Sequence, residues 1–426
     1  MGQGTTRVMK FGGASVKNAE AIRRVGTILQ GFEQDALMVV VSAMDKTTNQ
    51  LETLAFLARD GQEAEAWAQF ERVRNFHLTI VKDLFADQQQ ARLIQEMADW
   101  LEEIRRIIQG ILWLEEFLPR TYDRIVSYGE LMSSFILGEY LNSISLPTQW
   151  LDARKLIVTD ASHKQAGVIW SLTEERIQAK VRPQLQTGKV LLSQGFIGAT
   201  QEGKTTTLGR EGSDYSGAIF AHCLEAADFT VWKDVPGILN ADPRLREDTI
   251  KLDQLSYQEA VEMTFFGASV IHPKTIKPLY NKQIPMRVKC FLDASLEGSA
   301  IGQERSQQEV PRYITKKRQA LLKIQPRDFS FMEERQIEII FQEAYKSGLK
   351  INLLQRSAIS LLLCVDDRPA IQAFGALLKD RYEMEVTGDL KLQTTVNYTE
   401  ADWLTAKDSQ LLQVREGRLF ALLPAD

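Results

Sequence analysis

A glycine-containing loop near the start of the chain separates a short strand-like run from a helical pattern. The loop is Lys10–Val16, Lys-Phe-Gly-Gly-Ala-Ser-Val, and a helix is expected to begin near Asn18. The apolar run Ala36–Val41 follows that helix and has the composition of a buried strand. Strand, loop, helix and second strand in this order predict an α/β unit at the start of the chain.

The same loop has the residues that a phosphate-binding loop requires. Glycines let backbone amides approach an anion, the helix N-terminus adds partial positive charge, and Lys10 adds a full charge. The spacing does not fit the P-loop pattern G-x-x-x-x-G-K-[ST], and a tight turn without a ligand is the alternative for Gly12 and Gly13. A second polar loop, Ser42–Thr48, follows the next strand at the edge where ligands lie in open α/β sheets.

The rest of the chain extends this α/β pattern and then changes. Residues 50–118 are rich in helix formers and predict a helical excursion. Strands and helices alternate again over about 120–300, which predicts a three-layer sandwich with a mostly parallel central sheet. Gly298, Gly302 and Pro311 mark 297–312 as a linker, so we expect domains at 1–298 and 313–426.

The second of these domains has the element order β-α-β-β-α-β, which predicts a ferredoxin-like α+β fold. The expected strands are 320–325, 350–355, 359–365 and 391–397, and the expected helices are 332–347 and 368–381. The last thirty residues contain strand-like runs but no complete second copy.

Composition excludes several classes of function. The 426 residues carry a net charge of −5 with both signs interspersed, so no basic stripe for nucleic acid is present. The three cysteines are far apart and the four histidines lack metal-ligand spacing, so we predict no metal site formed by these residues and no disulfide framework. No run approaches 18 apolar residues. We therefore expect a cytoplasmic protein with no membrane and no nucleic-acid partner.

One formal motif match is rejected on physical grounds. Gly198–Thr205 fits the P-loop expression, but no helix-forming segment follows its Gly-Lys-Thr. Thr206-Thr207-Leu208-Gly209 is rich in β-branched residues and ends in glycine, so a β-hairpin turned at 201–204 is predicted instead.

The segment after this hairpin has groups for a ligand that carries both charges. Arg210 has the planar fork that binds carboxylate or phosphate, and Ser213 and Asp214 lie at the start of the next helix. An arginine and a carboxylate together favour a zwitterionic ligand, although Ser213 or Asp214 could simply cap the helix.

For two further segments, a structural explanation and a ligand-binding explanation are both open. Glu130 follows Tyr128-Gly129 at an expected helix start, where it either complements the helix dipole or holds a substrate ammonium. Lys233 and Arg244 lie in turns that Pro-Gly and Asp-Pro enforce regardless of function, and they would suit nucleotide phosphates if the turns face the site.

Taken together, these segments resemble the aspartate kinases of the amino-acid kinase superfamily, with an appended ACT-like region. The similar segments occur in the family's order, and they are Lys10–Val16, Val41–Thr48, Arg124–Ser134, Thr205–Asp214, Trp232–Arg244 and Phe266–Pro278. The resemblance implies ATP- and Mg²⁺-dependent phosphorylation of the β-carboxylate of L-aspartate, an early step towards lysine, threonine and methionine.

The resemblance also implies a role for each matching residue. Lys10 and Asp214 would be catalytic, with Lys10 neutralising the transferred phosphoryl group. The implied aspartate-binding residues are Ser42, Thr48, Glu130, Arg210 and Ser213, and the implied ATP-binding residues are Gly12, Gly13, Lys233, Asp234 and Arg244. No general base is needed, because a carboxylate nucleophile is already ionised near neutral pH.

Some positions depart from the family pattern. Ala14, Glu211 and Leu239 replace a usual threonine, glycine and tyrosine, and Ser269 replaces a lysine that normally approaches the nucleotide phosphates. A catalytically weak homologue with a regulatory role is therefore one alternative, and a kinase of the same fold for another acidic amino acid is a second. The ACT-like region implies an amino-acid effector, such as lysine, and a homodimer or higher homo-oligomer.

Overall fold

The computed structural model describes residues 5–268, 271–407 and 409–425. The chain forms two compact units, of which the first holds residues 1–238, 251–261 and 271–306 and the second holds the remainder. Two short strands, β8 (Ile238–Leu239) and β9 (Lys251–Leu252), occur where the chain passes between units.

An eight-stranded sheet forms the centre of the first unit, in the order β10-β12-β11-β7-β1-β2-β4-β3. Its pairs are parallel except β11–β12, so the expected mostly parallel sheet is confirmed. The strands are β1 (Thr6–Phe11), β2 (Ala36–Val41), β3 (Thr148–Leu151), β4 (Val190–Gln194), β7 (Asp228–Lys233), β10 (Gln254–Ser256), β11 (Met286–Cys290) and β12 (Ser299–Gly302).

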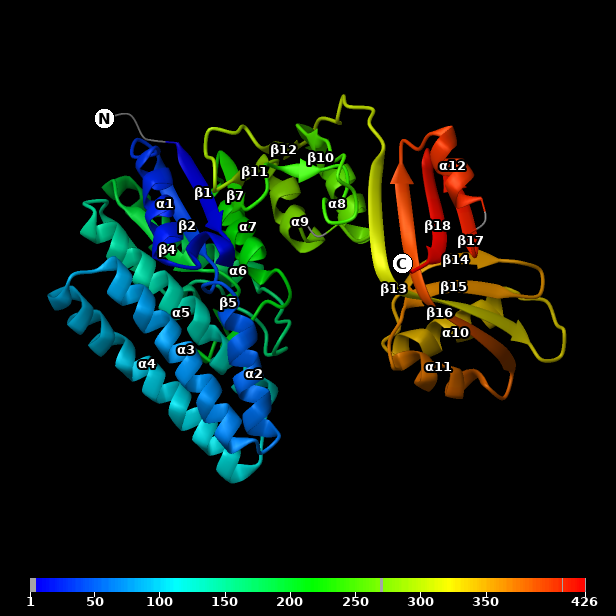
Figure 1. Cartoon of the computed structure of the whole chain (residues 1–426), viewed down its shortest axis with the longest axis horizontal. Helices are drawn as coiled ribbons and strands as arrows, with labels where there is room; N and C mark the ends of the chain where they lie inside the picture. The colour runs from blue at the N-terminus through cyan, green and yellow to red at the C-terminus, as the bar shows by residue number, and fades with distance from the viewer. Residues whose placement is uncertain (1–4, 269–270, 408, 426) are drawn as a thin grey trace. The chain divides into compact units, whose positions relative to one another are not determined.

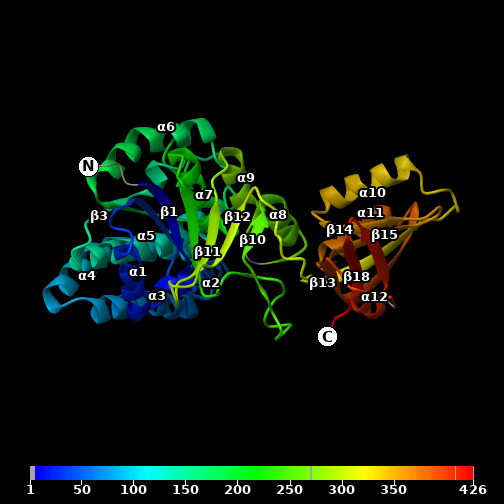
Figure 2. The ribbon, with the colours of Figure 1, turned by 90° about the horizontal axis from the view of Figure 1, so that it is seen from above.

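Helices cover both faces of this sheet, which confirms the three-layer sandwich. Figure 1 shows α3, α4 and α5 side by side on one face, and Figure 2 shows α6 on the other side of the sheet from α3 and α1. Helix α7 packs on β1, β2 and β7, with α6 and α9 beside it. The helices are α1 (Ala19–Gln30), α2 (Thr47–Arg59), α3 (Glu63–Leu84), α4 (Asp87–Leu114), α5 (Pro119–Ser143), α6 (Trp170–Lys180), α7 (Gly212–Leu224), α8 (Tyr257–Phe265) and α9 (Pro273–Lys282).

Local sequence explains the first β-α-β unit. Phe11 ends β1, and the Asn18 side chain accepts a hydrogen bond from the amide of Ala21, capping α1. Ile22 and Val25 on α1 are fully buried in the core beneath the sheet. The helical excursion expected over 50–118 is also present, as α2, α3 and α4.

The predicted hairpin at 201–204 and the expected linker at 297–312 can both be compared with the structure. β5 (Ile197–Ala199) and β6 (Thr205–Thr207) pair antiparallel, so the predicted hairpin is confirmed and the P-loop match is excluded. The expected linker 297–312 is wrong at its start. Ser299–Gly302 forms β12, because its backbone pairs with both β10 and β11.

The second unit contains a six-stranded antiparallel sheet in the order β14-β15-β13-β16-β18-β17. Its first four strands and two helices follow the predicted ferredoxin-like order. Strands β13 and β16 are 15 residues each, far longer than expected, and pair along most of their length. The strands are β13 (Arg312–Pro326), β14 (Ile351–Arg356), β15 (Leu361–Asp366), β16 (Tyr382–Val396), β17 (Leu411–Arg415) and β18 (Arg418–Pro424).

Three helices pack on this second sheet. Helices α10 (Glu334–Lys346) and α11 (Ala370–Leu378) bury Ile340 and Phe374 against Leu322 and its neighbours. The short helix α12 (Glu400–Ala406) covers β18 and begins with a capping box. In both units together, no helix within the described ranges is long and apolar enough to cross a membrane.

Candidate active site

A buried ion pair joins the first strand to the start of helix α7. The Lys10 ammonium on β1 lies 2.6 Å from Oδ1 of Asp214, the third residue of α7. Only 7% of Lys10 and 4% of Asp214 are exposed. The two residues for which the family resemblance implies a catalytic role are therefore in direct contact.

A second lysine shares the same carboxylate. Lys233, the last residue of β7, lies 3.4 Å from the other oxygen of Asp214. It is close because β1 and β7 are adjacent parallel strands that end at the same edge. Burial acts to raise the pKa of Asp214, but the charges of Lys10 and Lys233 outweigh it and lower the pKa to about 2. Lys10 and Lys233 thus present two ammonium groups side by side on Asp214, an arrangement that suits a phosphate.

The glycines of the first loop permit close backbone packing. A Cβ atom on Gly13 would lie 2.7 Å from the carbonyl oxygen of Asp45 and 2.8 Å from that of Ala43, too close for any side chain. On Gly12 the Cβ would lie 3.6 Å from the Lys10 ammonium, an ordinary contact. Gly13 is therefore required by the fold, whereas Gly12 keeps space open beside the lysine.

Glu130 lies in the interior of α5, which corrects the expected helix start at this position. The helix begins eleven residues earlier, at Pro119, a residue favoured at the first helical position. One carboxylate oxygen, Oε1, accepts hydrogen bonds of 3.3 Å from the amide of Ala43 and the hydroxyl of Thr48. The explanation of Glu130 as a first-turn acid is thus excluded.

The second carboxylate oxygen of Glu130, Oε2, differs from the first in its surroundings. Oε2 is buried and has no hydrogen-bond partner within the described residues, and the residue is 2% exposed. Burial raises the pKa of Glu130 to about 8, although the two hydrogen bonds and the charge of Lys10 act in the opposite direction. An incoming ammonium group would satisfy both the oxygen and the negative charge.

The other predicted site residues are more dispersed. Ser42 is half-buried, and its carbonyl oxygen accepts a 2.7 Å bond from Ser133. Arg210 and Asp234 are exposed. Arg244 lies in the second unit, and its guanidinium pairs with Asp242 at 2.7 Å.

The start of α7 differs from the capping expected there. Glu211 is the N-cap residue, in the left-handed conformation with φ of 56°, and its side chain makes no capping bond. Ser213 is buried inside the helix and Asp214 faces the lysines, so neither caps it. Burial raises the pKa of Glu211, the charge of Lys233 opposes this, and its Oε2 has no hydrogen-bond partner in the described chain.

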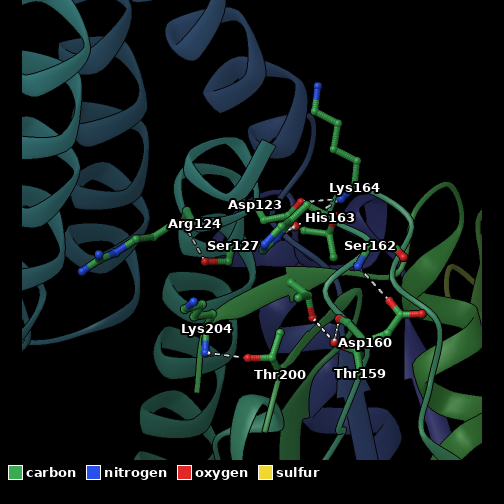
Figure 3. Close-up of polar contacts among 12 residues, drawn as sticks. Asp123, Arg124, Ser127, Thr159, Asp160, Ser162, His163, Lys164, Thr200 and Lys204 are labelled. Atoms are coloured by element: carbon green, nitrogen blue, oxygen red, sulfur yellow. Dashed lines mark hydrogen bonds and ion pairs between the residues drawn. The ribbon is translucent and has the colours of Figure 1, made fainter. Parts of the chain in front are cut away.

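A buried polar cluster that sequence reasoning missed connects α5 to the loop before α6 and to strand β6. Asp123 accepts hydrogen bonds from the Thr207 hydroxyl at 2.7 Å and the Lys164 amide at 3.0 Å, and its Oδ2 lies 2.7 Å from Nδ1 of His163 (Figure 3). Asp123 precedes Glu130 by seven residues, about two helical turns, so both lie on one face of α5. That spacing was the available signal.

Comparison with known proteins places this geometry in a family. The model of the amino acid kinase family matches residues 5–290. The chain is 31% identical over 390 residues to the lysine-sensitive aspartokinase 3 of Escherichia coli K12, covering 89% of this chain and 82% of that protein. The chain belongs to the amino acid kinase family, among its aspartokinases.

Other relatives agree with this placement. An aspartokinase of Chlamydia trachomatis is 34% identical over 294 residues, covering 69% of this chain and 64% of that protein. A bifunctional aspartokinase/homoserine dehydrogenase of Zea mays is 32% identical over 295 residues, and the match spans 32% of its length. The chain thus matches about a third of that longer relative.

Solved structures of the family show the same fold. The E. coli aspartokinase III complex with aspartate and ADP superposes with a TM-score of 0.85 at 26% identity, covering 98% of this chain and 96% of that one. A second E. coli structure, with lysine and aspartate, gives 0.79 with the same coverage. Ser269, where the family usually has lysine, lies outside the described residues.

Proposed function

We propose that this aspartokinase transfers the γ-phosphoryl group of ATP to the β-carboxylate of L-aspartate, giving 4-phospho-L-aspartate. The observation that carries the proposal is the position of Lys10, whose charge acts on both Asp214 and Glu130. The Lys10 ammonium thus acts both on Asp214, in the cluster that suits a phosphate, and on the carboxylate of Glu130, which forms no ion pair among the described residues. The relatives named aspartokinase and the fold shared with the aspartate- and ADP-bound E. coli enzyme support it.

The substrate's charged groups match the groups on the protein. Glu130 binds the α-ammonium of aspartate, assisted by Thr48, which is bonded to the same carboxylate. Arg210 binds the α-carboxylate, because a guanidinium pairs with a carboxylate through two parallel bonds. This leaves the β-carboxylate of aspartate directed toward Lys10.

Phosphoryl transfer needs positioning and charge neutralisation more than covalent help. Lys10 and Lys233 neutralise the phosphate oxygens, and Asp214 holds both ammonium groups in place until the nucleotide arrives. Gly12 leaves the approach to Lys10 open. We assign Ser42 and Ser213 to aspartate binding, and Gly13 and Asp234 to nucleotide binding.

The acidic residues present fit a magnesium ion. Mg²⁺ binds through one or two carboxylates together with substrate phosphates and water. Asp214 and Glu211 interact electrostatically at the start of α7, and Glu211 Oε2 is buried with no hydrogen-bond partner in the described chain. We propose that these two side chains hold the Mg²⁺ of Mg-ATP, where it would neutralise charge on the nucleotide phosphates.

We propose that the second unit is an ACT-like regulatory and dimerisation region that binds an amino-acid effector, with lysine the first candidate. Its ferredoxin-like strand order supports this, as does the lysine-bound structure of the E. coli relative.

Trapping the acyl phosphate tests the reaction directly. The protein is incubated with ATP, Mg²⁺ and hydroxylamine, together with aspartate, glutamate or N-acetylglutamate, and hydroxamate is measured. We expect hydroxamate from aspartate. Its absence would exclude the proposed reaction, and a higher yield from glutamate would reassign the substrate. Calorimetric titration with lysine tests the effector, and no heat would contradict it.

A further inference from the structure

A pocket of about 560 Å³ lies in the first unit among α4, α5, the turn after β3 and the β5–β6 hairpin. Four of its lining side chains are cationic, and they are Arg120, Arg124, Arg154 and Lys204. Glu103 is the acidic residue among them. None of these residues belongs to the active site proposed above.

Two of the four cations are already neutralised. Arg124 forms an ion pair with Glu103. Arg154 forms a bidentate pair with Asp152, with Nε–Oδ1 and Nη2–Oδ2 distances of 2.9 and 2.8 Å. Among the residues that the structure describes, no carboxylate pairs with Arg120 or Lys204. Glu202, in the same hairpin, interacts electrostatically with Lys204, but along the pocket lining itself four cationic side chains face one acidic residue.

The start of α5 adds to this positive charge. Pro119 is the first helical residue, no acidic residue occupies the first turn, and no side chain caps the helix. The N-terminal turn carries partial positive charge, so acidic residues are favoured there and a cation is disfavoured. Arg120 in that turn is thus electrostatically unfavourable unless an anion is bound nearby.

The balance of charge changes along α4, where a neighbouring hollow shares Glu103 and Arg124 with this pocket. This hollow has mixed sign, because Asp99 and Glu102 line it together with Arg106. Figure 3 shows Arg124 extending away from the Asp123–His163 cluster, although Asp123 and Arg124 are consecutive on α5. The pocket and that cluster are therefore separate features of the same helix.

We infer that this pocket binds a small phosphate dianion, either inorganic phosphate or a phosphomonoester. The lining is cationic in excess, and guanidinium groups bind phosphate oxygens in pairs. The ligand would connect Arg120 on α5 with Lys204, the residue that directly precedes β6. The inference does not depend on the proposed reaction.

Calorimetric titration with inorganic phosphate tests the site, with ADP and Mg²⁺ saturating so that the active site is filled. We compare the wild type, the double variant R120Q/K204Q, and the control K180Q/K189Q, which removes two exposed lysines elsewhere. Loss of two charge-assisted contacts should weaken phosphate binding at least about tenfold in the first variant and leave it unchanged in the control. Unfolding curves verify that both variants are folded.

Equal phosphate affinity in wild type and R120Q/K204Q would overturn the inference, as would an absence of phosphate binding to the wild type. Titration with phosphoserine distinguishes the two sources, since tighter binding than inorganic phosphate would identify a phosphomonoester. Titration with succinate tests the chemistry, because equal or tighter binding of this dicarboxylate would contradict a phosphate site.

Discussion

Lys10 and Asp214 form a buried ion pair between the end of strand β1 and the first turn of helix α7, with 2.6 Å between Nζ and Oδ1. The pair is possible because Gly217, one turn further along α7, lets the helix approach the sheet. A Cβ there would lie 2.5 Å from the ring of Phe229 and 3.5 Å from Cβ of Lys10.

Replacing Lys10 by methionine should lower the rate of aspartyl hydroxamate formation at least about 100-fold, because a full charge facing the transferred phosphoryl group is lost. Lys17→Met, an exposed lysine just after the same loop, is the matched control and should retain its rate. The change also leaves Asp214 with one cation, so stability must be followed separately. K10M/D214N removes both charges and should regain stability without regaining activity. Full activity of K10M would exclude the phosphate role.

Aspartate binding should strengthen as pH rises towards 8. Because the pKa of Glu130 is raised to about 8, this carboxyl is mostly protonated below that pH in the free protein. An ammonium group needs the ionised form, so the dissociation constant for aspartate should rise up to about tenfold for each pH unit below 8. Titrations between pH 6 and 9 measure this slope. Glu130→Gln should bind weakly at every pH, and a wild-type affinity that is flat across the range would contradict the assignment.

Glu211→Gly should raise the Mg²⁺ concentration that gives half-maximal rate by several-fold, because a proposed ligand is removed. Glu225→Gly is a close control. Glu225 also adopts a left-handed conformation, with φ of 51°, but at the opposite end of α7. Both variants relieve backbone strain of about 1 kcal/mol, but Glu225→Gly also removes the ion pair of Glu225 with Lys282, so the unfolding midpoint of each is measured alongside. An identical Mg²⁺ dependence in the two variants would remove Glu211 from the metal site.

The two loop glycines should respond differently to alanine. Gly13→Ala should destabilise the first unit and lose activity, since its Cβ would overlap two carbonyl oxygens. Gly12→Ala has space for a methyl group and should keep the wild-type unfolding midpoint, but it should raise KM for ATP because the methyl lies beside the Lys10 ammonium. Thermal unfolding and ATP kinetics on both variants separate fold from function. Equal unfolding midpoints for Gly12→Ala and Gly13→Ala would show that the loop rearranges to accept a methyl group at position 13.

Asp123→Asn should loosen the contact of helix α5 with the loop before α6 and with strand β6. Asparagine keeps one acceptor oxygen, but its NH₂ replaces the other and the negative charge is lost. The bonds from Thr207 and the Lys164 amide to Oδ1 and the contact of Oδ2 with His163 therefore cannot all keep their strength. Hydrogen exchange should quicken over 160–168 and 205–208. Asp160→Asn alters hydrogen bonds only within the loop before α6, so hydrogen exchange over 205–208 should stay unchanged in this control. Unaltered exchange at β6 in Asp123→Asn would show that the cluster does not hold the hairpin.

Local patterns were sufficient to predict the elements that local chemistry determines. The helix start near Asn18, the apolar run of β2 and the hairpin at 201–204 each follow from a few neighbouring residues. The resemblance implied a catalytic role for both Lys10 and Asp214 but not their contact, because packing of α7 on β1 brings together residues about 200 positions apart.

Other features depend on tertiary contacts that a sequence pattern does not display. Helix α5 continues through Gly129 because its neighbours bury it, so the glycine did not mark a boundary. Ser299–Gly302 contains residues typical of a linker, yet pairing on both sides makes it a strand. The raised pKa of Glu130 comes from burial, which becomes visible only in the folded chain.

The pairing of β13 with β16 has a consequence for synthesis of the chain. Arg312 pairs with Val396, which is made 84 residues later. At about 5–20 residues per second, the ribosome adds Val396 about 4–17 s after Arg312. During that interval the edge of β13 that faces β16 has no partner strand, so it is open to pairing with other chains.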